Sequence, residues 1–90
     1  MKPLTPEQLL IIADEFCAHH GGAIRSYSAL CAAAAIPGAR IEGIPVFDSP
    51  VAAGEALARG VVKLEPLRGD NSAFASTARD VYVRWAETIS

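Results

Sequence analysis

The chain has 90 residues, of which 51% are apolar and 20% charged, with a formal net charge of −2. This length and composition indicate one folded domain, residues 1–90, and exclude a disordered chain; the scattered Lys and Arg residues do not favour a nucleic-acid binder. No apolar stretch approaches the ~18 residues of a membrane span and the start lacks a signal-peptide pattern, so we expect a cytoplasmic protein that does not bind membranes.

A first helix is predicted over residues 6–20. Thr5 suits its N-cap, Pro6 its first helical position, and Gln8 completes a Thr-x-x-Gln capping box. A pair of glycines follows the helix, and glycine readily adopts the left-handed conformation of a helix end.

The thiols and histidines of the first half indicate neither a disulfide nor a metal site. Cys17 and Cys31 lie within apolar helical runs, so we expect buried, reduced thiols. Cys17, Asp14 and the pair His19–His20 share one helix end, with no second cluster of ligands elsewhere in the sequence. We therefore expect no metal and no cofactor.

A second helix is predicted in "AIRSYSALCAAAAIPG", capped near Ser26 or Ser28 and ended by Pro37 and Gly38. Residues 38–48 contain glycines, a proline and alternating apolar residues, which indicate a loop or a short extended segment.

A third helix opens at Ser49 and Pro50 and ends before Pro66. Two glycines, Gly54 and Gly60, lie within it, and we expect close helix crossings at both. A last helix in "NSAFASTARDVYVRWAETIS" carries one apolar stripe: Phe74, Ala78, Val81, Tyr82, Trp85 and Ile89. The predicted fold is all-α, a small bundle of about four helices.

The turn "KLEPLRGDNSAF", residues 63–74, holds the candidate site residues. Glu65 ends one helix and faces the turn, so it is the candidate general acid or base, with an ion pair to a nearby arginine as the alternative. The helix N-terminus that follows is a natural anion site. The candidate ligand-binding residues are Arg68, Gly69, Asp70, Asn71 and Ser72. A helix capped by its own aspartate is the structural alternative, since that carboxylate would repel a phosphate.

The order of these segments resembles the Fic/Doc (death-on-curing) family along nearly all of the chain. "LTPEQLLIIADEFCAHHGGAIRSYSAL" is similar to the family's opening, and "SPVAAGEALARGVVKLEPL" to the helix before its active-site loop. That loop reads His-x-Phe-x-Asp/Glu-Gly-Asn-x-Arg in the family. Asn71 coincides with the motif's Asn, and Leu67 can replace its Phe.

The departures from the motif fall on the chemical groups. The resemblance implies that Glu65 stands in place of the catalytic His, Gly69 in place of the metal-binding acid, and Asp70 in place of the anion-hole Gly. Ala73 replaces the phosphate-holding Arg. Family members transfer AMP or a phosphoryl group to a protein hydroxyl, which depends on electrostatic stabilisation of the phosphate by these groups.

We therefore expect a degenerate Fic/Doc-like protein that has lost AMP or phosphate transfer and binds a protein partner or small-molecule ligand in the old active-site cleft. One alternative is a repurposed enzyme that uses Glu65 as acid or base; another is a bacterial toxin-type transferase of a toxin–antitoxin system. The resemblance implies an antitoxin-like partner. The sequence does not decide between a monomer and a homo-oligomer.

Overall fold

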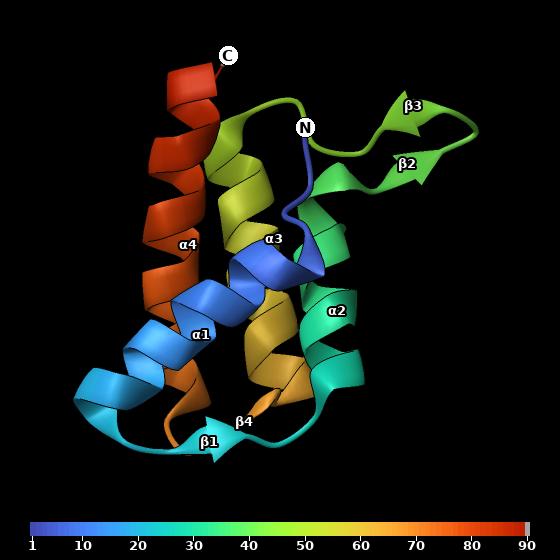
Figure 1. Ribbon diagram of the computed structural model, residues 1–90. Coiled ribbons are helices and arrows are strands. Elements are labelled where there is room, and N and C mark those ends of the chain that lie inside the picture. Colours follow the sequence, from blue (N-terminus) through green and yellow to red (C-terminus); the bar gives the residue numbers. More distant parts are fainter. Residues whose placement is uncertain (90) are drawn as a thin grey trace.

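The computed structural model describes residues 1–89, which form four α-helices joined by short connections (Figure 1). The helices are α1 (Pro6–His20), α2 (Tyr27–Ala35), α3 (Pro50–Leu64) and α4 (Asn71–Ile89). A short 3-10 helix, η1 (Ile36–Gly38), extends α2. The prediction of a small all-α bundle of about four helices is confirmed.

The first three helices begin at the polar residues that the sequence indicates. Thr5 Oγ1 accepts a hydrogen bond from the Gln8 amide at 3.1 Å, and Gln8 Oε1 accepts one from the Thr5 amide at 2.8 Å, which completes the capping box. Ser26 caps α2 by accepting from the amide of Ala29, and Ser49 caps α3 in the same way. Of the two caps considered for the second helix, the first is therefore the one used.

Two pairs of short antiparallel strands accompany the helices. β2 (Arg40–Ile41) and β3 (Ile44–Pro45) form a hairpin within the segment expected to be a loop or extended. β1 (Ala23–Ile24) pairs with β4 (Leu67–Arg68), a contact that the sequence did not predict. Figure 1 shows the two pairs at opposite ends of the molecule, with β4 and the turn that contains it far from the hairpin.

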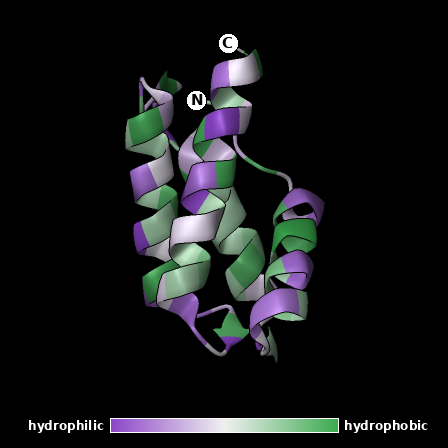
Figure 2. Cartoon of the chain, turned by 90° about the vertical axis from the view of Figure 1, so that its left-hand side faces the viewer, coloured by the Kyte–Doolittle hydropathy of each residue, from purple (hydrophilic) through white to green (hydrophobic). Residues whose placement is uncertain are grey.

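The hydrophobic core draws on all four helices. Its fully buried side chains include Leu9, Leu30, Leu57, Phe74 and Tyr82. Figure 2 shows hydrophobic and hydrophilic segments alternating along the helices, as expected where each helix buries one face.

The most extensive helix contact joins α3 and α4, and glycines permit the close approach of α3 to its neighbours. A Cβ atom added at Gly54 would lie 2.6 Å from Val83 of α4. One added at Gly60 would collide with Ile36 of η1. The predicted close crossings at these two glycines are confirmed.

The apolar stripe of α4 is only partly covered. Phe74, Ala78 and Tyr82 are buried, whereas Val81 and Ile89 are 43% and 48% exposed. Figure 1 shows the reason: α1 runs obliquely across α4, so it covers part of the stripe. The buried face of α4 also includes Ala75 and Ala86, which lie outside the predicted stripe, so the buried face is rotated relative to the stripe.

The two cysteines are free thiols, as expected. Both are half-buried rather than buried, and Cys17 packs against the edge of the core. Burial raises the pKa of the Cys17 thiol, and the nearby Asp14 carboxylate adds to the effect. Within residues 1–89, no helix combines the length and apolar character needed to cross a bilayer.

Candidate functional site

The turn between α3 and α4 is held in place by β1 and by the glycine pair after α1. β4 pairs with β1 so that Ala23 faces Arg68 and Ile24 faces Leu67. Gly22 approaches the turn so closely that a Cβ atom there would collide with the Arg68 carbonyl oxygen. The turn is therefore a packed part of the fold rather than a free loop.

Asn71 uses its side chain to fix the turn. Its Nδ2 donates to the Leu67 carbonyl oxygen and its Oδ1 accepts from the Leu67 amide, both at 3.0 Å. The Leu67 side chain is only 2% exposed and belongs to the core. One amide side chain thus satisfies both backbone groups of a buried anchor residue.

Asp70 caps α4. Its Oδ1 accepts a hydrogen bond from the amide of Ala73 at 2.9 Å, and its carbonyl oxygen accepts from the amide of Phe74 at 3.0 Å. The carboxylate therefore places a negative charge at the positive end of the helix, and the self-capped arrangement considered from the sequence is present. Gly69 precedes it with a φ of +140°, a backbone conformation that favours glycine.

Glu65 ends α3 in the left-handed conformation, with a φ of +49°. Its side chain is exposed, and no hydrogen bond or ion pair of its carboxylate occurs within residues 1–89. Arg68, the neighbour considered as its ion-pair partner, is exposed and makes no ion pair with it in the same range.

Arg25 is a residue of this site that sequence reasoning did not single out for a role. Its Nε donates to the Glu65 carbonyl oxygen at 2.6 Å, and its Nη2 donates to the Leu64 carbonyl oxygen at 2.8 Å. The last carbonyl groups of a helix have no hydrogen-bond partner within the helix, and they form its negative end. The Arg25 guanidinium therefore supplies both the missing donors and a favourable positive charge at the end of α3. In the sequence, only the position of this arginine shortly after the glycine pair could have indicated a role in the turn.

Ser72, the last of the predicted ligand-binding residues, lines a groove between α3 and α4 of about 320 Å³. Arg59 and Lys63 stand one turn apart on the α3 wall of this groove. Within residues 1–89 neither cation has an ion-pair partner. The groove is also lined by Ala58, Val62, Ala75 and Ser76, and by Glu55, whose carboxylate is paired with Arg79. We call this feature the α3–α4 groove.

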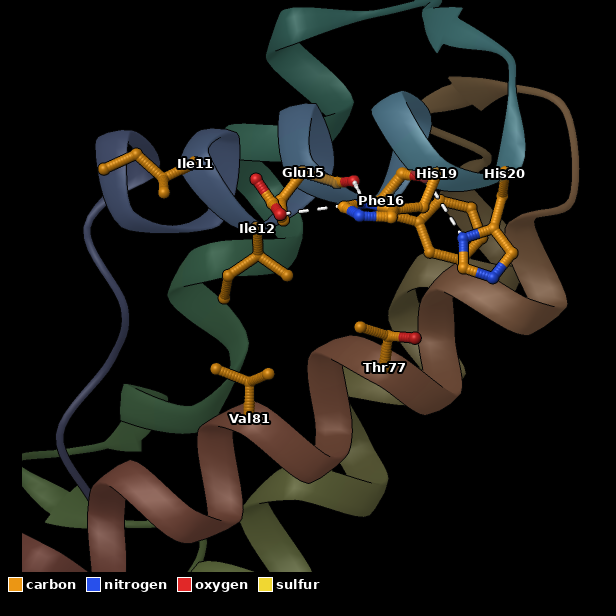
Figure 3. Close-up of a pocket in the computed structure, with 8 residues that line it drawn as sticks. All are labelled: Ile11, Ile12, Glu15, Phe16, His19, His20, Thr77 and Val81. Atoms are coloured by element: carbon orange, nitrogen blue, oxygen red, sulfur yellow. Dashed lines mark hydrogen bonds and ion pairs between the residues drawn. The ribbon is translucent and has the colours of Figure 1, made fainter.

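A larger hollow, lined by none of the residues of the turn, lies between α1 and α4, and we call it the α1–α4 pocket (Figure 3). It measures about 450 Å³. Its apolar wall consists of Ile11, Ile12 and Phe16 of α1 and Val81 of α4. Sequence reasoning missed this pocket because its existence depends on the angle at which α1 crosses α4.

The polar residues of the α1–α4 pocket are Glu15, His19 and His20 of α1 and Thr77 of α4. Two of these residues, His19 and His20, belong to the group for which the sequence indicated no metal site. Within residues 1–89, no group of three potential metal ligands comes together.

The arrangement of helices defines a small all-α domain with a fixed, self-capped turn between α3 and α4 and two surface hollows beside α4. The chain matches no protein-family model, no curated protein and no solved structure.

Proposed function

We propose that this protein is a degenerate Fic/Doc-like domain that no longer transfers AMP or phosphate and instead binds a partner or ligand in the α3–α4 groove beside the former catalytic turn. The observation that carries the proposal is the capping of α4 by Asp70, whose Oδ1 lies 2.9 Å from the Ala73 amide. In the family that the sequence resembles, this helix start receives phosphate. Here a carboxylate occupies it, and like charge repels a phosphate.

The chemical groups around that helix start support the same proposal. Ala73 brings no cation for a phosphate, and Asn71 is engaged with both backbone groups of Leu67. Glu65, at the position of the family's catalytic His, is an exposed carboxylate at the end of α3. Loss of one phosphate-stabilising group commonly reduces the rate by a factor of about 100 to 1,000, and here several are replaced together.

Binding in the α3–α4 groove is supported by two positively charged side chains of its wall that have no ion-pair partner within residues 1–89. Arg59 and Lys63 are exposed and unpaired within residues 1–89, whereas Glu55, which also lines the groove, is paired with Arg79 of α4. Two like charges one helical turn apart repel each other slightly, so an acidic group placed between them relieves that repulsion. We propose that the partner or ligand, an antitoxin-like protein included, presents a carboxylate or another anion there.

The loss of transfer is tested by thermal unfolding with ATP and Mg²⁺ and by assaying AMP and phosphoryl transfer to protein substrates. We expect no change in the melting temperature and no transfer. A ligand at 100 times its Kd stabilises a protein by about 2.7 kcal/mol, which raises the melting temperature of a domain of this size by roughly 10–20 °C. An ATP-dependent rise of that order, or measurable transfer, would contradict the proposal.

The binding function is tested by comparing proteins captured by three variants of the immobilised chain. The unmodified chain and Arg84→Glu, which alters an exposed arginine of α4 outside the groove, should recover the same partner. The double variant Arg59→Glu/Lys63→Glu should lose it. Recovery of the same proteins by all three chains, or of none specifically, would refute binding in the α3–α4 groove.

A further inference from the structure

The α1–α4 pocket has a chemical character of its own, separate from the turn and from the α3–α4 groove. It is mostly apolar, and two residues of its wall, Ile11 and Val81, are 68% and 43% exposed. A concave apolar surface with a few polar groups at one end is the usual form of a small-molecule site. The polar groups therefore decide which ligand the pocket fits.

The histidines of this pocket have a defined proton arrangement. His19 Nδ1 lies 2.9 Å from the Glu15 carbonyl oxygen, and His20 Nδ1 lies 3.1 Å from the Phe16 carbonyl oxygen. A carbonyl oxygen can only accept, so each Nδ1 carries the proton. In the neutral imidazole the Nε2 atom is consequently a hydrogen-bond acceptor. No residue in the range 1–89 forms a hydrogen bond with either Nε2 atom.

His20 is the better-positioned acceptor of the two. Its ring stacks on Phe16, with ring centroids 4.2 Å apart and an angle of 10° between the planes. The stacking and the Nδ1 bond together fix the ring, so little freedom remains to be lost on binding. Figure 3 shows the His20 imidazole and the Thr77 hydroxyl at the same end of the pocket, on opposite walls.

The charges at the pocket argue against an anionic ligand. The Glu15 carboxylate lines the pocket, with Oε1 3.6 Å from His19 Nδ1. The other charged residues of α1 are Glu7 and Asp14, and the helix contains no Lys or Arg. A carboxylate or phosphate approaching this helix is repelled, whereas a neutral molecule is not.

We propose that the α1–α4 pocket binds a small neutral alcohol, whose apolar body packs on Ile11, Ile12 and Val81 and whose hydroxyl donates a hydrogen bond to His20 Nε2. The Thr77 hydroxyl, a hydrogen-bond donor on the facing wall, is available to the oxygen of the same ligand. This site goes beyond the proposed function, because it uses none of the residues of the turn or of the α3–α4 groove.

The test compares three probes that share a para-ethylphenyl group: para-ethylphenol, its methyl ether para-ethylanisole, which cannot donate, and para-ethylbenzoate ion, which is charged. Titrations are followed by the amide proton–nitrogen correlation spectrum of the full chain. A ligand of this size is expected to bind with a Kd of about 1 mM. The phenol should shift signals of residues 11–20 and 77–81 and should bind roughly tenfold more tightly than the ether, the effect of one hydrogen bond.

Two variants assign the preference to one nitrogen. His20→Phe keeps an aromatic ring over Phe16 but removes Nε2, so phenol and ether should then bind equally. His19→Gln is the matched control and should leave the phenol-to-ether ratio unchanged. Because the readout is a ratio within each variant, a small loss of stability does not affect it.

Four results would overturn the proposal: equal binding of phenol and ether to the unmodified chain, tighter binding of the benzoate, signal changes centred outside the pocket, or no saturable change at about ten times the expected Kd. Retention of the phenol preference in His20→Phe would show that this imidazole is not the acceptor.

Discussion

Replacement of Asn71 by alanine should destabilise the protein more than its position at a turn suggests. The side chain satisfies both the amide and the carbonyl oxygen of Leu67, each at 3.0 Å, and the Leu67 side chain is 2% exposed. Removing one partner of a buried hydrogen bond costs about 1–3 kcal/mol, because the remaining group is left desolvated. With two groups affected and the site only half-buried, we expect a loss of about 2–3 kcal/mol.

The measurement is urea-induced unfolding at equilibrium, supported by thermal unfolding. For a domain of this size the expected loss corresponds to a fall of roughly 10–20 °C in the melting temperature. The exchange rate of the Leu67 amide proton should also rise, since that proton loses its acceptor. Asn71→Asp should be at least as destabilising, because a carboxylate oxygen then replaces the Nδ2 donor opposite the Leu67 carbonyl.

The control is Ser72→Ala, the next residue, whose side chain is exposed. Its free energy of unfolding should change by no more than about 0.5 kcal/mol. If Asn71→Ala lost less than about 0.5 kcal/mol, or no more than Ser72→Ala, the structural role assigned to the amide would be refuted.

Three further changes are expected to have measurable effects on stability. Glu65→Gly should stabilise the protein by about 1 kcal/mol in urea unfolding, since Glu65 has a φ of +49° that glycine adopts without strain; an unchanged midpoint would contradict this. Gly22→Ala should be clearly more destabilising than Gly21→Ala, because both positions have positive φ but only the added Cβ at Gly22 collides with a neighbour; equal losses would argue against the packed turn. Tyr82→Phe should lose about 1 kcal/mol, because the hydroxyl donates to a backbone carbonyl 2.7 Å away. Burial raises the pKa of Tyr82, so its contribution is complete below the unfolded value of about 10 and decreases as the pH rises above it. The decline in stability with pH in that range should therefore be shallower in Tyr82→Phe, and an identical slope would refute the assignment.

Local sequence patterns predicted the helices well because the interactions that start them join residues close in the chain. The Thr5–Gln8 capping box spans three residues, and Ser26 and Ser49 each cap an amide three positions on. Such contacts form with little loss of chain entropy, so they can be read from the sequence alone. The two internal glycines of α3 were likewise informative, since their propensity cost in a helix indicated close neighbours.

The environment of the candidate residues could not be predicted in the same way. Glu65 receives its backbone hydrogen bond from Arg25, 40 residues away, and β4 pairs with β1 across a similar separation. Strands of two residues carry no periodic pattern that would indicate a partner. The candidate roles of Glu65, Arg68 and Ser72 in catalysis or binding stay predictions, with the variants described above as their test.

The sequence by itself indicated the approximate bounds of each helix and the all-α class, and it offered the self-cap of Asp70 as one of two alternatives for the last helix, because these features depend on contacts within a few residues. Only the tertiary structure decided that Arg25 and β1 hold the turn, that part of the α4 stripe stays exposed, and that two hollows flank α4. These features follow from the angles at which packed helices cross, and side chains distant in the sequence set those angles together.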